Sequence, residues 1–392
     1  MLSEKRIVLG VSGGIAAYKS VEISRRLVDA GAFVSPIMTS AAKKFIGEVT
    51  LSALASEPVK SSLWDDDDPI PHTTLGQQAD LILVAPATAK LIGTYAAGIS
   101  SDLLSATLLA TRAPVILCPA MHTEMWEHPA VQENINTLKS RGVVIVDPED
   151  GILAGGDLGK GRLAGVEAIL SEVESTLTKK DLSNLRLLIT AGGTREPIDP
   201  VRYITNKSSG KQGYALAKAA HLRGAEVTLV TTMPDDAPFG VEVLCAETAS
   251  DMRNVVMGIQ SEYDVIIMAA AIADFRPAEI SEQKIKKRKG STNLKLENTH
   301  DFLIDLGKGK RPEQTIVGFA AETEHLEENA LEKLERKHLD LIVANNVSHP
   351  GVGFSYDTNE VTIMSQDSKW TLPLSDKRII ADGILDALLE VR

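Results

Sequence analysis

Short runs of aliphatic residues alternate with amphipathic stretches along the whole chain. In the first half the runs are RIVLGV, FVSPIM, DLILVAPA, PVILCPA and VVIVDP, and stretches with helical periodicity such as IAAYKSVEISRRLVDAG lie between them. Buried strands that alternate with helices are typical of a parallel sheet with helices on both faces. The pattern therefore predicts an α/β fold of the doubly wound, Rossmann-like type.

The same alternation starts again in the second half. The polar segment SEVESTLTKKDLSN, residues 171–184, is interpreted as the end of a helix and a linker, and further strands follow it: LRLLITA, EVTLVTT, DVIIMAAA, TIVGFAAE and DLIVANNV. NEVTIMS and SKWTLPLS alternate apolar and polar residues, so we expect them to form an antiparallel hairpin at the sheet edge. A chain of 392 residues suits two domains, which we place at residues 1–178 and 184–392.

Charge and cysteine content narrow the function classes. A formal net charge of -12 argues against nucleic acid or an anionic membrane as a partner, so local groups must bind any anionic ligand. The two cysteines, Cys118 and Cys245, exclude a disulfide scaffold and suit a reducing compartment. No apolar run reaches membrane-spanning length, and the first strand begins by Arg6, too early for a signal peptide. We therefore expect a cytoplasmic protein.

A glycine turn follows the first strand in LGVSGGIAAYK. Backbone N–H groups after Ser12, Gly13 and Gly14 can bind an anion at the start of the next helix. The dinucleotide fingerprint would need a third glycine and a carboxylate at the end of the second strand, but that strand ends at Thr39 and Ser40. A mononucleotide such as flavin mononucleotide (FMN) fits this pattern better than NAD, and a plain tight turn is the alternative.

A second, longer glycine-containing loop begins after LLITA and ends in ITNKSSGKQGYALAKAA. It separates strand from helix by about 20 residues, and loops of that length in compact domains are usually functional or disordered. Its positively charged and amide side chains are Arg195, Arg202, Asn206, Lys207 and Lys211. The loop therefore predicts part of a nucleotide or phosphate site, with a solvated basic loop as the alternative.

Several segments together resemble one family. They are GVSGGIAAYK, APATAKLIG, SSDLLSATLLA and PAMHTEMW in the first half, and TAGGTREPIDPVRYITNKSSGKQG, AAAIADFRP, KIKK, GFAAETE and LDLIVAN in the second. The chain resembles the bifunctional coenzyme A biosynthesis enzymes, in which phosphopantothenoylcysteine decarboxylase is fused to phosphopantothenate–cysteine ligase. The motifs cover nearly the whole chain in the family's order.

For the first half, the resemblance implies a decarboxylase that uses FMN. The flavin oxidises the thiol-bearing carbon to a thioaldehyde, so that the carbanion left by loss of carbon dioxide delocalises onto sulfur. His72 in DPIPHTTLG matches the family's catalytic histidine; without the resemblance it would be a surface histidine. A helix cap is an alternative role for the Thr88 hydroxyl. The flavin-contacting segments are matched by Ser12, Gly13, Gly14, Thr39, Ser40, Thr88 and Asp102.

The first half departs from the family at two places. His122 follows PAM where many members have an asparagine that holds the substrate carboxylate; an imidazole can also bind a carboxylate, in a pH-dependent way. Gly155, between Ala154 and Gly156, replaces a cysteine that donates a proton in the final reductive step. We expect this glycine-rich segment to form a mobile flap with Arg162 available for the substrate phosphate. Cys118 is interpreted as a core residue.

For the second half, the resemblance implies a ligase that activates 4′-phosphopantothenate with CTP. An acyl-cytidylate forms, pyrophosphate leaves, and the amine of cysteine attacks; Mg²⁺ and lysines balance the phosphate charge. The metal ligands are not identified. Asn206 matches the residue that helps to bind the intermediate, and Lys284 of KIKK matches the lysine of the cysteine step. The matched nucleotide-binding residues are Ser209, Gly210, Gly213, Ala269, Ala270, Asp274, Lys284, Phe319, Lys333 and Lys337.

Each of these residues has a structural alternative. KIKKRKG could be a solvated basic face, Phe319 a core residue, and the pair Lys333 and Lys337 a solvated helix face. The family also implies small-molecule substrates and homo-oligomers, with trimers of the first domain and dimers of the second. The alternative functions are an NAD-type dehydrogenase, whose fingerprints are missing, a non-catalytic regulatory flavoprotein, and an active ligase with an impaired decarboxylase.

Overall fold

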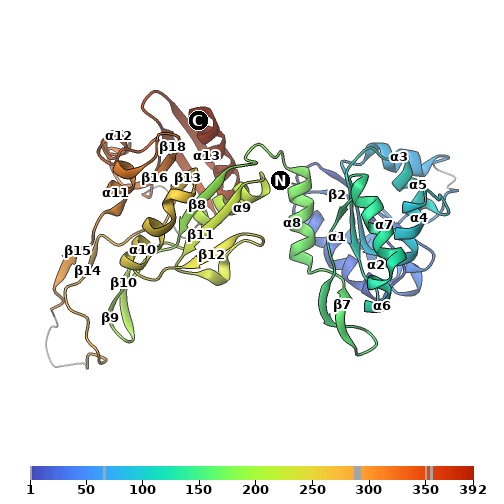
Figure 1. The fold of residues 1–392 in the computed structure, drawn as a ribbon. Coiled ribbons are helices and arrows are strands. Elements are labelled where there is room, and N and C mark those ends of the chain that lie inside the picture. The colour runs from blue at the N-terminus through green and yellow to red at the C-terminus, as the bar shows by residue number, and fades with distance from the viewer. Residues whose placement is uncertain (1, 65–67, 287–292, 349–350, 354–355) are drawn as a thin grey trace. The chain divides into compact units, whose positions relative to one another are not determined.

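The chain folds into two compact units, Met1–Lys179 and Lys180–Arg392 (Figure 1). A computed structural model describes residues 2–64, 68–286, 293–348, 351–353 and 356–392. Within these ranges no helix is both long enough and apolar enough to cross a membrane. Each unit contains its own sheet and its own hydrophobic clusters, so each is described separately below.

The N-terminal unit is built on a five-stranded parallel sheet. Its strands, in spatial order, are β2 (Phe33–Met38), β1 (Arg6–Val11), β3 (Leu81–Ala87), β4 (Val115–Pro119) and β5 (Val144–Ile145). A hairpin of β6 (Glu149–Ile152) and β7 (Leu158–Arg162) follows the sheet. The helices are η1 (Ile15–Tyr18), α1 (Lys19–Asp29), η2 (Ala42–Lys44), α2 (Glu48–Leu54), α3 (Pro71–Gln78), α4 (Ala89–Ala96), α5 (Leu103–Ala110), α6 (Thr123–Glu127), α7 (Pro129–Ser140) and α8 (Val166–Leu177).

Helices cover both faces of this sheet. On one face, Ile23 and Leu27 of α1 pack with Ile169 of α8 in one buried cluster. On the other face, α4, α5 and α7 contribute to a second cluster. The strands read as continuous apolar runs because both of their faces are buried.

The C-terminal unit is built on an eight-stranded sheet. Its spatial order is β12 (Glu242–Cys245), β11 (Glu226–Thr231), β8 (Arg186–Ala191), β13 (Val265–Met268), β16 (Thr315–Glu322), β17 (Leu341–Asn346), β18 (Thr358–Met364) and β19 (Lys369–Asp376). The first six strands run parallel, and β18 and β19 run antiparallel at the edge. The expected edge hairpin is therefore confirmed.

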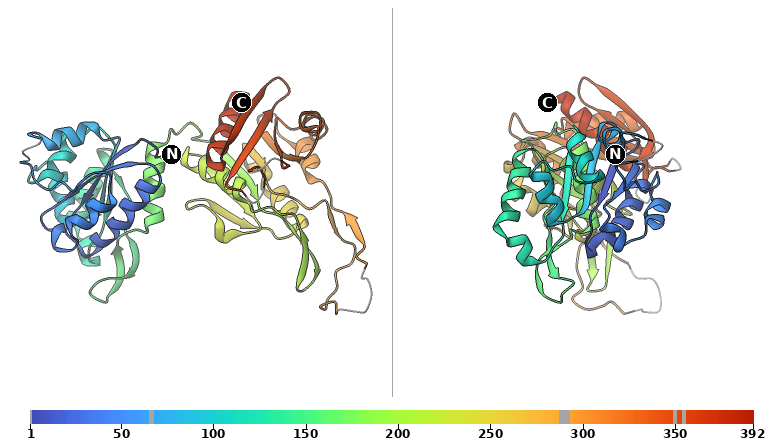
Figure 2. Two further views of the ribbon diagram at one scale, coloured as in Figure 1. Left: turned by 180° about the vertical axis from the view of Figure 1, so that it is seen from behind. Right: turned by 90° about the vertical axis from the view of Figure 1, so that its right-hand side faces the viewer.

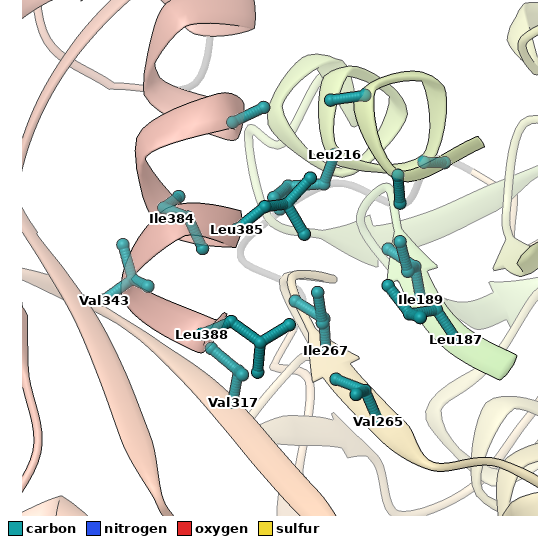
Figure 3. Close-up of a cluster of buried hydrophobic side chains, with 14 of the residues drawn as sticks. Leu187, Ile189, Leu216, Val265, Ile267, Val317, Val343, Ile384, Leu385 and Leu388 are labelled. Carbon is teal, nitrogen blue, oxygen red and sulfur yellow. The ribbon is translucent and has the colours of Figure 1, made fainter. Parts of the chain in front are cut away.

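The helices of this unit also form two layers. The helices are α9 (Lys211–Leu222), η3 (Pro234–Asp236), α10 (Ala249–Ile259), η4 (Gln260–Glu262), α11 (Phe302–Gly309), α12 (Leu326–Arg336) and α13 (Lys377–Val391). Figure 3 shows Leu216 of α9 and Leu385 of α13 facing Ile189 and Ile267 of the sheet. On the opposite face, α10, α11 and α12 contribute to a separate buried cluster.

Three segments differ from what the sequence predicts. VVIVDP forms only the short strand β5 at Val144–Ile145, because the chain then turns into the β6–β7 hairpin. The loop between β8 and α9 is not structureless: it contains β9 (Arg195–Asp199) paired with β10 (Arg202–Thr205). A third pair, β14 (Phe275–Pro277) with β15 (Leu296–Asn298), lies beside β9, and both pairs extend away from the sheet of their unit (Figure 2).

We expect Ile267→Ala to destabilise the C-terminal unit by about 2–5 kcal/mol, because its fully buried side chain leaves a cavity in the central strand β13. Urea unfolding of the full chain, with hydrogen exchange of peptides from this unit, measures the loss. Leu331→Ala on α12, where the leucine is 42% exposed, is the control and should cost well under half as much. Equal losses for both variants would contradict the assigned core.

Candidate active sites

The N-terminal unit contains a cavity of about 590 Å³ where its parallel strands end. Loops after β1, β2, β3 and β4 line it, together with the β6–β7 hairpin. Ligands of open α/β sheets bind at this edge, and the volume lies within the ~300–1,000 Å³ that is usual for ligand pockets. The predicted residues in its lining are Ser12, Gly13, Gly14, Thr39, Ser40, Thr88, Asp102 and His122.

The turn after β1 is fixed by close packing and by one buried hydroxyl. A Cβ atom on Gly13 would lie 2.3 Å from the Cβ of Ala41, so only glycine allows the β1 turn to approach the loop after β2. The Ser12 hydroxyl donates to the Pro86 carbonyl at 2.8 Å and accepts from the Thr88 N–H at 2.9 Å. These contacts bring the ends of β1, β2 and β3 together.

Thr88 and Asp102 act as helix caps and also line the cavity. The Thr88 hydroxyl accepts from the Leu91 N–H at 3.5 Å at the start of α4. Asp102 accepts from the Ser105 N–H at 2.8 Å and forms a capping box with the Ser105 side chain at the start of α5. The capping alternative therefore holds for Thr88, and its contact with a flavin stays a prediction.

The rim of this cavity combines apolar and cationic side chains. Ile15, Tyr18, Met125 and Ile152 line it and remain largely exposed, which suits a flat apolar ring. Burial, together with the nearby Arg162 charge, lowers the pKa of Lys19. Sequence analysis did not single out Tyr18 or Lys19, although both stand within or next to the glycine motif.

The β6–β7 hairpin lies directly on the segment after β4, at two glycines. The Met121 N–H donates to the Gly161 carbonyl at 3.0 Å, and a Cβ on Gly161 would lie 2.1 Å from the Met121 carbonyl oxygen. A Cβ on Gly159 would lie 2.3 Å from the Thr123 hydroxyl oxygen. The glycine-rich segment is therefore a hairpin docked on the Met121–Thr123 segment, with Arg162 also in the cavity lining.

His72 does not line this cavity. It lies in the first turn of α3, which packs against α5, and its buried Nδ1 has no hydrogen-bond partner among the described residues. Its predicted place beside a flavin is therefore not found within its own unit. Cys118, by contrast, is fully buried, which confirms its core role and raises the pKa of its thiol.

The C-terminal unit contains a second cavity, of about 310 Å³, where β13, β16 and β17 end and α9 begins. Four lysines line it against two aspartates, so it is locally positive in a chain of net charge -12. The predicted residues in its lining are Asn206, Ser209, Gly210, Gly213, Ala269, Ala270, Asp274, Phe319, Lys333 and Lys337. Within the described ranges, no cluster of three or more His, Cys, Asp or Glu residues could hold a metal ion.

Glycines and one amide shape the entrance to α9. Gly210 has a φ of +72° at the N-cap, a conformation that favours glycine. A Cβ on Gly213 would lie 2.6 Å from the Cβ of Ala191, so α9 lies directly against β8. The Asn206 amide donates to the Ala271 and Ile272 carbonyls at 3.3 and 3.1 Å, which ties this loop to the segment after β13.

The far side of this cavity carries an aromatic ring and paired lysines. Phe319 is half-buried and packs against the core cluster beneath it. Lys333 forms an ion pair with Glu322 at 2.5 Å, and Lys337 with Asp301 at 2.8 Å. A bound phosphate would therefore have to share these two ammonium groups with carboxylates.

The chain matches two family models that together span nearly its whole length. Residues 182–391 match "DNA/pantothenate metabolism flavoprotein C-terminal domain", and residues 1–178 match "Flavoprotein". "Coenzyme A biosynthesis bifunctional protein CoaBC" of Bacillus subtilis is 44% identical over 396 residues, which cover 99% of this chain and 97% of that protein. The chain belongs to this family. It is a bifunctional enzyme of coenzyme A biosynthesis whose N-terminal unit is of the flavoprotein type.

A further relative and two solved structures are similar to this chain or to part of it. The Mycobacterium tuberculosis protein of the same name is 44% identical over 403 residues, 98% of this chain and 96% of its own. A solved C-terminal domain of a CoaBC protein is 40% identical with a TM-score of 0.45, and covers 54% of this chain and 96% of that one. An FMN-dependent cysteine decarboxylase is 28% identical with a TM-score of 0.40, over 44% of this chain and 99% of that one.

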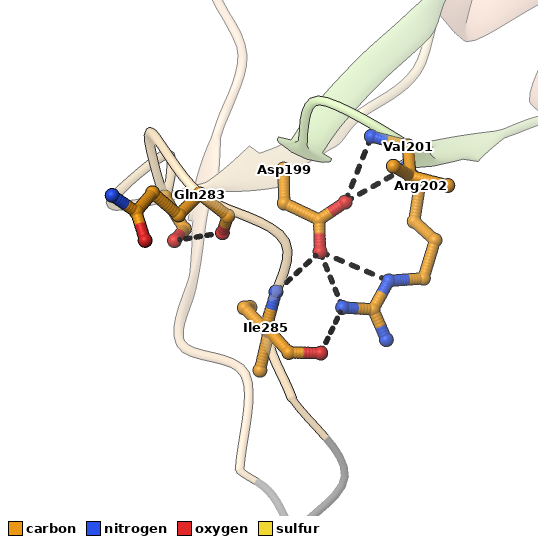
Figure 4. Close-up of polar contacts among 6 residues, drawn as sticks. Asp199, Val201, Arg202, Gln283 and Ile285 are labelled. Atoms are coloured by element: carbon orange, nitrogen blue, oxygen red, sulfur yellow. Dashed lines mark hydrogen bonds and ion pairs between the residues drawn. The ribbon is translucent and has the colours of Figure 1, made fainter.

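Lys284, a predicted family residue, lies outside the second cavity. It is exposed on the segment after β14, and Lys287 of the same motif lies outside the described residues. The segment is fastened at Ile285: the Ile285 N–H donates to Asp199 at 3.1 Å, and its carbonyl accepts from Arg202 at 2.9 Å (Figure 4). Lys284 is therefore held beside the β9–β10 turn.

Asp199 is the centre of this fastening. Its side chain is fully buried, pairs with Arg202, and also accepts from the backbone N–H groups of Val201 and Arg202 at 2.9 and 3.0 Å. The Arg202 guanidinium, helped by these N–H groups, holds the pKa of Asp199 well below its usual range. The folded-state pKa is depressed, so the stabilisation is present at neutral pH and is lost only when strong acid protonates the carboxylate.

A buried lysine in the second cavity, Lys377, was not indicated by any sequence motif. Lys377, at the start of α13, is 6% exposed and donates to the Gly353 and Tyr356 carbonyls at 3.0 and 2.6 Å. Burial, and next the Lys211 charge, lower the pKa of Lys377 to about 8. The motif-based reading missed it because it stands after the last strand, far along the chain from the nucleotide motifs.

We expect Gly13→Ala to destabilise the N-terminal unit and to lower the amount of flavin that copurifies, because the new methyl group overlaps Ala41. Thermal unfolding and the visible spectrum measure both effects. Gly14→Ala is the matched stability control: its extended backbone accepts alanine, and the added Cβ would meet only the Thr88 methyl at 3.6 Å. A larger stability loss in Gly14→Ala would contradict the assigned contact.

We expect Asp199→Asn to accelerate amide hydrogen exchange in residues 280–286, because it removes the charge that pairs with Arg202 and weakens the bond to the Ile285 N–H. Mass spectrometry of peptides measures the rate. Glu297→Gln, which removes the exposed partner of Arg276 on β14, is the control and should leave this segment unchanged. Unchanged exchange in Asp199→Asn would show that Ile285 is held by other contacts.

Proposed function

We propose that the C-terminal unit joins cysteine to 4′-phosphopantothenate with CTP and Mg²⁺, and that the N-terminal unit decarboxylates the product with FMN. The observation that carries this proposal is the presence of two chemically different cavities in one chain. One is rimmed by exposed apolar side chains, and the other is lined by four lysines and two aspartates. Each unit matches the corresponding part of the bifunctional family.

The first cavity fits a flavin mononucleotide. The glycine turn and the Thr39 and Thr88 hydroxyls offer a polar end where the strands finish, and Ile15 and Tyr18 offer an apolar surface for a ring. When bound, FMN would supply reversible two-electron chemistry at the thiol-bearing carbon of the substrate. The chain would orient the substrate: Arg162 of the hairpin would bind its phosphate, and the docked hairpin would limit access of water.

The second cavity suits activation of a carboxylate by a nucleoside triphosphate. Phe319 would flank the base, and the start of α9, with Ser209 and Gly210, would face phosphate oxygens. Lys333 and Lys337 would exchange their carboxylate partners for phosphate as pyrophosphate leaves. Mg²⁺ would lie mainly on phosphate oxygens, with Asp274 as the nearby carboxylate of the lining. The preference for CTP over ATP is an expectation from the family.

Assembly into trimers of the first unit and dimers of the second is part of this proposal. His72 supports it, because it does not line the cavity of its own unit and would need a neighbouring copy to reach a flavin. Lys284 supports it in the same way for the second cavity. Sedimentation of the full chain tests the state, and a monomer with both activities would contradict it.

The decisive experiment supplies the purified chain with 4′-phosphopantothenate, cysteine, CTP and Mg²⁺. We expect release of pyrophosphate, formation of the amide, and then loss of carbon dioxide from it, all followed by mass spectrometry. The proposal would be overturned if the protein did not bind added flavin and released no pyrophosphate. Amide that accumulates without loss of carbon dioxide would instead favour a ligase with an impaired decarboxylase.

We expect Lys337→Ala to lower kcat/KM for pyrophosphate release by roughly 10- to 100-fold, because it removes a charged hydrogen-bond donor from the second cavity. The same variant should decarboxylate supplied 4′-phosphopantothenoylcysteine at the normal rate, since that step belongs to the other unit. Lys308→Ala on α11, outside the cavity lining, is the control. If Lys337→Ala lost ligase and decarboxylase activity to the same extent, the assignment of one activity to each unit would be contradicted.

A further inference from the structure

Loss of carbon dioxide creates a need for an acid in the first cavity. The electron pair left on the substrate is shared by carbon and sulfur as an enethiolate, and the carbon must gain a proton before the saturated thiol can form. We propose that His122 donates this proton, and that Gly155 leaves the space in which its ring does so. This inference rests on the proposed decarboxylase function of the N-terminal unit.

The turn of the β6–β7 hairpin places Gly155 against the ring of His122. A Cβ atom on Gly155 would lie 2.9 Å from Cε1 and 3.6 Å from Nε2 of His122. The imidazole therefore occupies the volume that a side chain at position 155 would need. The Oδ2 atom of Asp157, in the same hairpin, lies 3.1 Å from this Cβ position on Gly155. The His122 ring, which lines the cavity, therefore lies against the turn of the hairpin.

The other polar groups of the described lining are less suited than His122 to donate this proton. Asp102 is engaged as a helix cap, and the Arg162 guanidinium does not release protons. Serine, threonine and tyrosine hydroxyls hold their protons to high pH. Imidazole rings exchange protons in the neutral range, which suits general acid catalysis. Two lysines of the lining, Lys19 and Lys90, are the competitors. The Lys19 ammonium group donates to the Leu163 carbonyl at 3.3 Å, and Lys90 is exposed.

The proton from His122 completes a balanced reaction. The substrate thiolate first gives up a hydride from the carbon that bears sulfur, which the FMN of the proposed function would accept, and becomes a thioaldehyde. The neighbouring carbon then loses carbon dioxide to leave the enethiolate. His122 transfers one proton to that carbon, which restores the thioaldehyde. The hydride returns to the thiol-bearing carbon and sulfur takes the electron pair. Solvent reprotonates the ring, so the net reaction consumes one proton and releases one carbon dioxide.

The test uses His122→Asn in the full flavin-loaded protein with 4′-phosphopantothenoylcysteine as substrate. In the absence of oxygen, which would reoxidise the flavin, we expect normal flavin content in the visible spectrum, carbon dioxide release limited to about one equivalent per flavin, and a product that lacks two hydrogens. Formation of the saturated thiol should fall by about 10²-fold or more. In deuterated water, the wild type should place one deuterium on the carbon that lost carbon dioxide.

Matched variants separate this role from a structural one. His128→Asn changes a second histidine of the same segment, which caps α7 outside the cavity lining, and should give the wild-type product. His122→Gln provides a second removal of the acid if the asparagine variant folds poorly. His122→Asn with Gly155→Cys should regain the saturated thiol, because a thiol then occupies the volume that the ring has left.

Two results would overturn the proposal. One is a wild-type ratio of saturated to unsaturated product in both His122 variants, and the other is accumulation of the unsaturated product in Lys19→Met but not in His122→Asn. Failure of the proposed function itself looks different: the flavin-loaded wild type would then release no carbon dioxide at all.

Discussion

Close backbone approach at a few glycines holds both sites together. Gly13 lies against Ala41 and Gly213 against Ala191, and in each case a single added carbon would overlap its neighbour. A parallel sheet already gathers its loops at one edge, but side chains would keep those loops apart. The glycines remove that spacing, so that hydroxyls and backbone groups from separate loops surround one volume.

In the second cavity, lysines are held in place by carboxylates. A chain with excess negative charge collects four lysines around one small volume, and its carboxylates already pair with two of them. Pairing keeps the ammonium groups oriented without a ligand, at the cost that a phosphate must displace a carboxylate. Lys377 is different, because carbonyl groups rather than a carboxylate hold it and its charge is only partly retained near pH 8.

Sequence reasoning was most successful where the signal was local. Both doubly wound sheets, the antiparallel edge and the buried Cys118 follow from runs of apolar residues and their periodicity. It was incomplete where long-range contacts decide the outcome. The segment between β8 and α9 forms a strand pair, and neither His72 nor Lys284 lines the cavity of its own unit, so their site roles stay predictions. A sequence motif identifies the residue, but tertiary packing determines the position of its side chain in the fold.

The fastening at Ile285 sets how far Lys284 can reach. The lysine is one residue from an anchor whose N–H and carbonyl are both bonded, so its ammonium group explores a small sphere around a fixed centre. The effective concentration of the ammonium group is therefore high close to Ile285 and falls to almost zero beyond the reach of the side chain. Any ligand of Lys284 must therefore bind beside the β9–β10 turn. Because the backbone next to Lys284 is already held, binding there costs little further chain entropy.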